Sequence, residues 1–154
     1  MNIYKSKRDW IYGSLFLGIG LLFIIIIFSA YFDMSFSEWL IMAIILSGIN
    51  TVLLISFFFI KIRIDSEDLV VNVIFDIFRV SIFKITKIRI GETMWSGFHK
   101  CGTSVGGLIV FSKFKNDLYI TPENRDEFLK KLLEINSHII IDDVRVKKAS
   151  RASA

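Results

Sequence analysis

Two long stretches without a charged residue constrain this chain more than any other feature. Residues 10–32 contain no Asp, Glu, Lys, Arg or His over 23 positions, and residues 39–60 contain none over 22. A helix rises about 1.5 Å per residue and the hydrocarbon core of a bilayer is about 30 Å thick, so roughly 20 apolar residues cross it. Residues 33–38 are all that separate the stretches. We therefore predict a membrane hairpin with transmembrane helices at 10–32 and 39–60 and an external turn at 33–38.

A secretory signal is the alternative interpretation of the first stretch, because basic residues precede it. The apolar region of a signal has about 7–15 residues and leads to a small-residue cleavage site. The stretch in this chain is longer, and a second one follows almost at once. We therefore favour two spans over a signal.

The charges beside the spans predict their orientation. Residues 1–9 carry three basic residues against one acid, and Lys61 and Arg63 follow the second stretch, whereas the turn carries only two acids. Lys and Arg near spans stay on the cytoplasmic side. We predict a multi-pass protein of the plasma (inner) membrane with both termini cytoplasmic. Cys101, the single cysteine, agrees with a reducing compartment.

Small or hydroxyl-bearing residues recur at four-residue spacing in both stretches, and Asn50 is their only amide. Helices in lipid pack closely through such residues. We predict that these stripes face each other or a partner protein, and that Asn50 makes an interhelical hydrogen bond rather than lining a pathway. The predicted packing residues are Ser14, Gly18, Ala43, Ser47, Asn50 and Thr51.

After the second stretch the hydrophobic period changes to that of strands. Residues 61 onward carry 16 basic and 12 acidic residues, as in an ordinary small globular domain. Alternation and β-branched runs predict short strands with no helix long enough for a parallel crossover, which favours an antiparallel sheet or barrel at residues 61–141. The predicted strands are 61–65, 69–75, 79–83, 87–90, 108–112 and 118–120, with a further short strand considered at 139–141.

One amphipathic helix is predicted at about 122–136. Thr121 is the expected N-cap and Pro122 suits the first helical position. Phe128, Leu129 and the leucines that follow form an apolar stripe that covers the open end of the barrel. Residues 142–154 are expected to form a flexible basic tail.

A series of short strands closed by one helix is the order of a pleckstrin-homology (PH) barrel, and particular residues extend the likeness. The stretch Leu118-Tyr119-Ile120-Thr121-Pro122, with Phe128 six positions after the proline, follows Gly102-Thr103-Ser104 and Leu108-Ile109-Val110. This resembles the YyaB-like bacterial PH-domain family, which has two membrane spans followed by a PH-like domain. The resemblance implies an α+β domain, an antiparallel β-barrel or sandwich capped by one C-terminal helix. Some small bacterial membrane proteins with PH-like domains protect their producer against its own bacteriocin, so immunity is a candidate function.

We expect no catalytic, metal or cofactor-binding site. His99 and Cys101 lack further ligands or an orienting base, and His138 is far from both in sequence. Residues 102–107 do not match a phosphate-binding glycine loop. The acidic turn 66–68 would repel a phosphoinositide head group.

Five basic residues outside that turn are candidates for contact with the membrane surface or a partner: Lys84, Lys87, Arg89, Lys113 and Lys115. Basic residues close to anionic lipid attract it. The alternative is a solvated face of mixed charge. Nucleic-acid binding is not expected, because the strand aromatics lie in apolar runs typical of a core.

These observations favour a non-enzymatic, membrane-anchored binding or adaptor module that engages a protein partner at the inner face of the plasma membrane. A peptide could add to an open sheet edge or lie beside the terminal helix. The alternative is a bacteriocin or toxin immunity protein whose hairpin shields the membrane or a membrane target. A homo-oligomer is left open.

Overall fold

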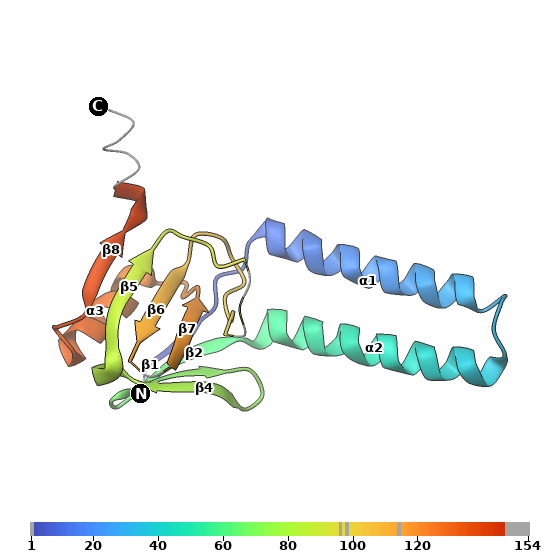
Figure 1. Cartoon of the computed structure of the whole chain (residues 1–154), viewed down its shortest axis with the longest axis horizontal. Coiled ribbons are helices and arrows are strands. Elements are labelled where there is room, and N and C mark those ends of the chain that lie inside the picture. Colours follow the sequence, from blue (N-terminus) through green and yellow to red (C-terminus); the bar gives the residue numbers. More distant parts are fainter. Residues whose placement is uncertain (1, 96, 98, 114, 147–154) are drawn as a thin grey trace. The chain divides into compact units, whose positions relative to one another are not determined.

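The computed structural model describes residues 2–95, 97, 99–113 and 115–146, except for the side chains of Lys115 and Asn116. The chain divides into two compact units, Trp10–Phe59 on one hand and Met1–Asp9 with Ile60–Ala154 on the other. The first unit is helical and the second consists of two sheets and a helix (Figure 1).

The helical unit is an antiparallel pair made of α1 (Trp10–Ala30) and α2 (Phe36–Phe59). Both helices are long and apolar enough to cross a membrane. The second begins earlier than predicted because Ser35 and Glu38 form a cap, in which the hydroxyl and the amide of Ser35 donate to the Glu38 carboxylate at 2.6 and 3.2 Å. Such a cap satisfies groups that a helix start leaves unpaired.

The first sheet contains β1 (Asn2–Lys5), β2 (Lys61–Asp65), β3 (Asp68–Asn72) and β4 (Asp76–Ser81), which neighbour one another in that order and are all antiparallel. A two-residue turn, in which Ser66 takes a φ of 52°, joins β2 to β3. The 3₁₀ turn η1 (Ile82–Lys84) then leads to the second sheet.

The second sheet contains β5 (Ile85–Ile90), β6 (Leu108–Ser112), β7 (Lys115–Ile120) and β8 (Ile140–Asp143). Its order is β7-β6-β5-β8. The pair β5–β8 is parallel, because helix α3 (Arg125–Ile135) intervenes and returns the chain to β5, whereas the other pairs are antiparallel. The prediction that no helix is long enough for a parallel crossover is therefore wrong for this pair.

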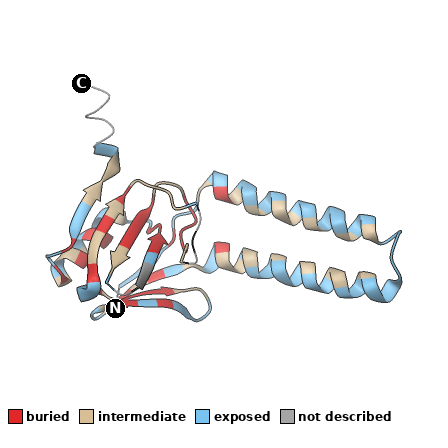
Figure 2. Cartoon of the chain, viewed as in Figure 1, coloured by how far each residue is buried: buried red, intermediate tan, exposed pale blue. Residues whose placement is uncertain are grey.

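The apolar residues of both sheets and of α3 form one core (Figure 2). Alternate residues of β2 face it, so that Ile62 is 0% exposed while Lys61 is on the surface. From α3, Phe128 and Leu132 are fully buried, and Tyr4 of β1 packs edge-on against the Phe128 ring with centroids 5.2 Å apart. The fold class is thus as predicted, two long apolar helices followed by a PH-like domain of sheets and one helix.

Two boundaries at the ends of the domain differ from prediction. Residues 1–9 were expected to precede the first span as a separate segment, but Asn2–Lys5 is a strand of the domain. The flexible tail was predicted to begin at residue 142, which is too early in the chain. Asp142 and Asp143 belong to β8, where the backbone pairs with β5. Residues 147–154 of that tail lie outside the described residues.

Two local predictions are also wrong. Helix α3 begins at Arg125 with Asn124 before it, so Thr121 is not its N-cap; Thr121 is buried and bonded to other segments instead. Residues 73–75, predicted as strand from their β-branched content, lie in the turn between β3 and β4, where Asn72 donates to Asp76 at 2.9 Å and closes the hairpin.

Candidate functional site: the hydroxyl seam and the adjoining cleft

The N-terminal segment runs along the domain beyond β1 before it reaches α1. Its first part pairs with β2, with Lys5 opposite Lys61. Its second part crosses to the other sheet, where Ser6 forms a β-bridge with Pro122 and Arg8 forms one with Thr103. The segment therefore joins the edge of the first sheet to the segments that flank β7.

Three buried hydroxyls hold this junction together, and we call Ser6, Thr103 and Thr121 the hydroxyl seam. The Ser6 oxygen lies 2.9 Å from both threonine oxygens. Thr103 completes the set by donating its hydroxyl to the Lys7 carbonyl at 2.7 Å and its amide to the Thr121 hydroxyl at 3.0 Å. Each side chain is 3% exposed. Because every member has partners, the cost of burying hydroxyls is offset in the folded state.

Main-chain bonds reinforce the seam on both sides. The Lys7 amide donates to the Thr121 carbonyl at 2.6 Å, and the Glu123 amide donates to the Lys5 carbonyl at 3.0 Å. The Asp9 carboxylate, one residue before α1, accepts from the Val105 amide at 2.7 Å. A bond from an amide to a charged acceptor is stronger than a neutral one, so the chain is fixed to the domain up to the last residue before the helix.

Tyr119 and two glycines shape the loop behind the seam. The Tyr119 hydroxyl donates to the Ser104 carbonyl at 2.6 Å and accepts from the Gly107 amide at 3.0 Å. A Cβ on Gly102 would lie 2.5 Å from the Tyr119 ring, and one on Gly107 would lie 2.6 Å from the Ile120 carbonyl oxygen. Both positions therefore require glycine, which explains the Gly-Thr-Ser-Val-Gly-Gly stretch of the sequence.

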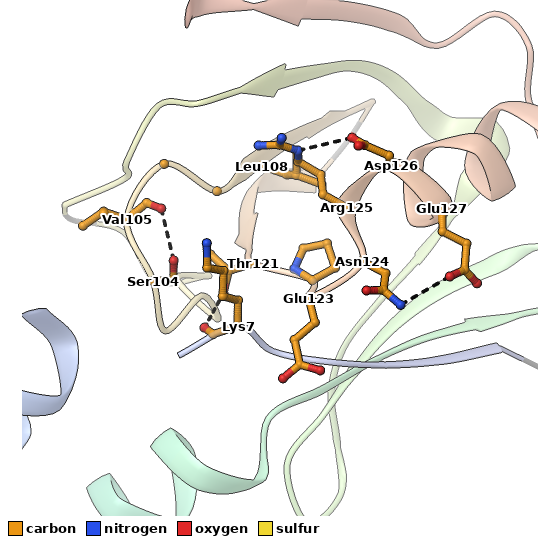
Figure 3. A pocket seen from close by; sticks show the side chains of 13 residues that line it. Lys7, Ser104, Val105, Leu108, Thr121, Glu123, Asn124, Arg125, Asp126 and Glu127 are labelled. Atoms are coloured by element: carbon orange, nitrogen blue, oxygen red, sulfur yellow. Dashed lines mark hydrogen bonds and ion pairs between the residues drawn. The ribbon is translucent and has the colours of Figure 1, made fainter. Parts of the chain in front are cut away.

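A cleft of about 400 Å³ opens beside the seam, between the loop at 104–108 and the start of α3. Figure 3 shows Arg125 and Asp126 turned toward each other, with the guanidinium 3.6 Å from the carboxylate. Glu123 and Glu127 also line the cleft, and Lys7 is its other base. Acids outnumber bases among these side chains, so the cleft suits a phosphate group poorly.

The basic residues predicted to form one surface have different surroundings, since some are exposed and others form ion pairs. Lys84 and Lys113 are exposed and adjacent, with the Lys113 amide donating to the Lys84 carbonyl at 2.9 Å. Lys87 instead pairs with Asp142 at 2.7 Å. Arg89 pairs with Glu92 at 2.8 Å and lies 3.6 Å from Asp142. The Lys115 side chain lies outside the described part of the chain.

The hairpin packs through residues other than the predicted small stripes. The rings of Phe16 and Phe57 lie 5.0 Å apart, and the Trp39 indole donates to the Ile27 carbonyl at 2.8 Å. Asn50 does face the other helix, where its amide lies 3.4 Å from the place of a Cβ on Gly20.

The predicted stripes of small residues therefore do not face each other. Ser14, Ser47 and Thr51 are exposed on the hairpin, where Ser14 and Thr51 bond carbonyls of their own helices. Gly18 has nothing within 4 Å of its Cβ position, and Ala43 is half-buried. The predicted alternative of a partner therefore remains for these residues: the stripes are available for contact with another protein.

The groups that could carry chemistry are held in structural roles. Burial raises the pKa of the Cys101 thiol to about 11, so the thiol is neutral near pH 7 and a poor nucleophile. The His99 ring packs edge-on against Phe78, with centroids 4.8 Å apart. Among the described residues there is no group of three metal-ligating side chains.

The sequence offered little sign of the hydroxyl seam. Ser6, Thr103 and Thr121 are far apart in the chain, and Thr121-Pro122 followed by acids resembles a helix start. The only local sign in the sequence was the glycine content of residues 102–107, since close approach of another segment to the backbone is a common reason for glycine.

Comparisons with known proteins agree with this architecture. A model of the family described as "Bacterial PH domain" matches residues 60–136, half of the chain. The chain is also similar to the "Uncharacterized protein YyaB" of Bacillus subtilis (strain 168), with 26% identity over 146 residues that cover 90% of this chain and 96% of the relative. Because it covers 90% of this chain, that similarity extends well beyond the matched domain. No solved structure matches.

Proposed function

Because this chain belongs to the bacterial PH domain family, we propose that it is a non-enzymatic, membrane-anchored module that engages a protein partner at the inner face of the plasma membrane. Its two candidate spans hold the domain at the bilayer.

The pairing of β1 with β2 is the observation that supports the anchor. Lys5 lies five residues before α1 and Lys61 two residues after α2, and the two lysines are opposite each other in the sheet. Opposite residues in antiparallel strands have Cα atoms about 5 Å apart. The pairing supports a hairpin whose two ends return to one folded domain, and it favours a retained span over a removable signal, because cleavage after α1 would take β1 away.

The charge distribution supports a cytoplasmic domain. Basic residues flank the domain ends of both helices, whereas the other ends carry Asp33, in the turn between the helices, and Glu38, in the first turn of α2. Accessibility of introduced cysteines in intact cells tests the orientation. Met34→Cys in the turn should react with a membrane-impermeant maleimide, and Phe83→Cys in the domain should react only after permeabilisation. The reverse pattern would overturn the orientation.

For the partner surface we choose the outer edge of β8, the last strand of the second sheet. At the other end of that sheet, β7 is bonded to residues 99–101, and in the first sheet the end of β1 is bonded through the Lys5 carbonyl to the Glu123 amide. At the edge position, β8 carries the exposed side chain of Ile140, which is 64% exposed. An extended peptide can add a strand to such an edge.

Replacing the hairpin by an unrelated pair of spans tests the proposal as a whole. The replacement should cover Trp10–Phe59 and keep residues 1–9, because they supply β1. We expect partners cross-linked in membranes to be retained in this variant and lost in Ile140→Lys, with Ile3→Lys on β1 as a control of equal chemistry. Loss in the hairpin variant alone would place the function in the spans.

Immunity remains the second candidate because small residues lie on the outside of the hairpin. Ser14, Ser47 and Thr51 face away from the helix pair, as suits contact with another protein in the membrane. The same hairpin replacement distinguishes the two functions. An immunity protein of this kind would lose protection against its toxin when the hairpin is replaced, whereas Ile140→Lys would leave protection intact.

A further inference from the structure

The turn between β3 and β4 exposes apolar side chains to an unusual degree. We call Val73, Ile74 and Phe75 the apolar tip. Ile74 is 71% exposed and Phe75 is 69% exposed. The tip is an ordered turn, closed by a bond from the Val73 amide to the Phe75 carbonyl at 3.2 Å. Turns usually carry polar residues, so adjacent exposed Ile and Phe at this position require a partner surface.

Strand register places the apolar tip at the end of the sheet from which the chain passes into the spans. Asn72, the last residue of β3, is opposite Lys61. Only Ile60 separates Lys61 from the end of α2, so Lys61 lies within roughly 7 Å of that helix at the reach of a peptide chain. Neighbouring strands are about 4.8 Å apart, and the tip extends past Asn72.

The opposite end of the same strands carries a different surface. Asp65 and Asp68 flank the turn there, and the Ile82 amide donates to the Glu67 carbonyl at 2.7 Å. Lys84, predicted to contact the membrane, follows Ile82 and so lies at this acidic end. The four steps from Asp68 to Asn72 along β3 separate the two ends by about 13 Å.

Charge beside the tip also matches a lipid surface. Lys5 and Lys61 are exposed and directly opposite each other, which is unfavourable in water and favourable next to anionic head groups. The acid beside the tip, Asp76, is bonded to Arg63 at 3.2 Å and Arg79 at 3.0 Å. Its charge is therefore offset within the domain.

We infer that the apolar tip inserts Ile74 and Phe75 into the boundary between head groups and acyl chains of the leaflet that α1 and α2 leave. This inference rests on the proposed membrane anchor. The domain is then attached at two points, through the spans and through the tip, and the acidic turn faces away from the lipid. The occupant is the bilayer itself, because Lys61, opposite the last residue before the tip, follows α2 by two residues and brings two exposed lysines to that end of the sheet.

Depth-dependent quenching tests the inference in the full chain reconstituted in vesicles that contain anionic lipid. In a Cys101→Ala background, single cysteines at Phe75 and Phe83 carry an environment-sensitive fluorophore. The two positions are matched, because Phe83 is also an exposed phenylalanine, at 56%, but lies at the acidic end. A third label at Ile25 in α1 reports whether the spans are in the bilayer.

We expect lipids brominated near the head group to quench the labels at positions 75 and 25 and to leave the label at position 83 unchanged. Quenching at position 25 with equal signals at positions 75 and 83 would overturn the tip inference while leaving the anchor intact. Absence of quenching at position 25 would overturn the anchor and the inference with it. Quenching at position 75 that is lost in Lys5→Glu/Lys61→Glu would add support for the basic flank.

Discussion

The two turns that join β2, β3 and β4 lie at opposite ends of the same strands and have opposite character. The turn at Ser66 and Glu67 is acidic and short, whereas the apolar tip exposes Ile74 and Phe75. Within a domain surrounded by water both turns would be expected to be polar. The inferred insertion of the apolar tip accounts for this difference, because Lys61, opposite the last residue before the tip, follows α2 by two residues.

The largest effect is expected from removing the core contact that fixes β1. Phe128→Ala deletes a fully buried ring that contacts Tyr4 and should lower the free energy of unfolding by about 4 kcal/mol. Chemical denaturation of the full chain in detergent micelles measures this. Phe83→Ala, at an exposed site, should change it by less than about 0.5 kcal/mol. Equal effects would mean that the core is not formed as described.

A smaller loss is expected at the hydroxyl seam. Thr121→Val keeps the shape but removes the acceptor of the Thr103 amide and a partner of Ser6, which should cost about 2 kcal/mol. In this variant the rate of amide hydrogen exchange should increase more in β1 than in β6. The control Thr86→Val removes one long bond, of 3.4 Å, at a half-buried site. Unchanged exchange in β1 would show that the seam does not hold the N-terminal segment.

Reversing one charge at the apolar end should have effects of opposite sign in two media. Lys61→Glu replaces a like-charge pair with Lys5 by an attractive one, so it should stabilise the domain in neutral detergent by about 0.5 kcal/mol. In vesicles with anionic lipid it removes an attraction of about 1 kcal/mol and should weaken quenching at position 75. The same sign in both media would contradict a lipid-facing end.

The smallest effect concerns the acid beside the apolar tip. The hydrogen bond from Asn72, followed by that from Arg79, holds the pKa of Asp76 below its ordinary value of 3.8. A lowered pKa in the folded state means that the carboxylate stabilises the fold above pH 3.8 and loses this contribution as the pH falls through the lowered value. The stability difference between wild type and Asp76→Asn should therefore shrink below pH 4. A constant difference across that range would show that the ionised form has no special role.

The sequence predicted the elements whose signal is local. Absence of charge revealed both spans, and alternation such as Ile62 and Ile64 facing one side revealed β2. It did not reveal β1, because a four-residue strand with only Tyr4 buried has almost no pattern. The prediction of a strand at residues 73–75 is wrong because β-branched content indicates a preference and does not indicate whether a neighbouring strand exists to pair with.

The candidate site depends on contacts between distant residues, which explains why it was not predicted. The partners of Thr121 are Ser6 and Thr103, and nothing near Thr121 in the sequence distinguishes a seam hydroxyl from a helix cap. The contacts within the hairpin were not predicted for a related reason. Small residues indicate that close approach is allowed but not whether it is to the other helix or to a partner, and the described contacts between the helices include that of Phe16 with Phe57.

The pairing of β1 with β2 also fixes an order of assembly. Asn2 of β1 is opposite Ile64 of β2, and both helices lie between the two strands in the chain, so β1 has no partner until both helices have been made. If one helix fails to cross the membrane, the two strands end on opposite faces of the bilayer and the edge of β2 remains open, where it is a target for aggregation or proteolysis. A completed sheet therefore reports that the hairpin has been inserted correctly.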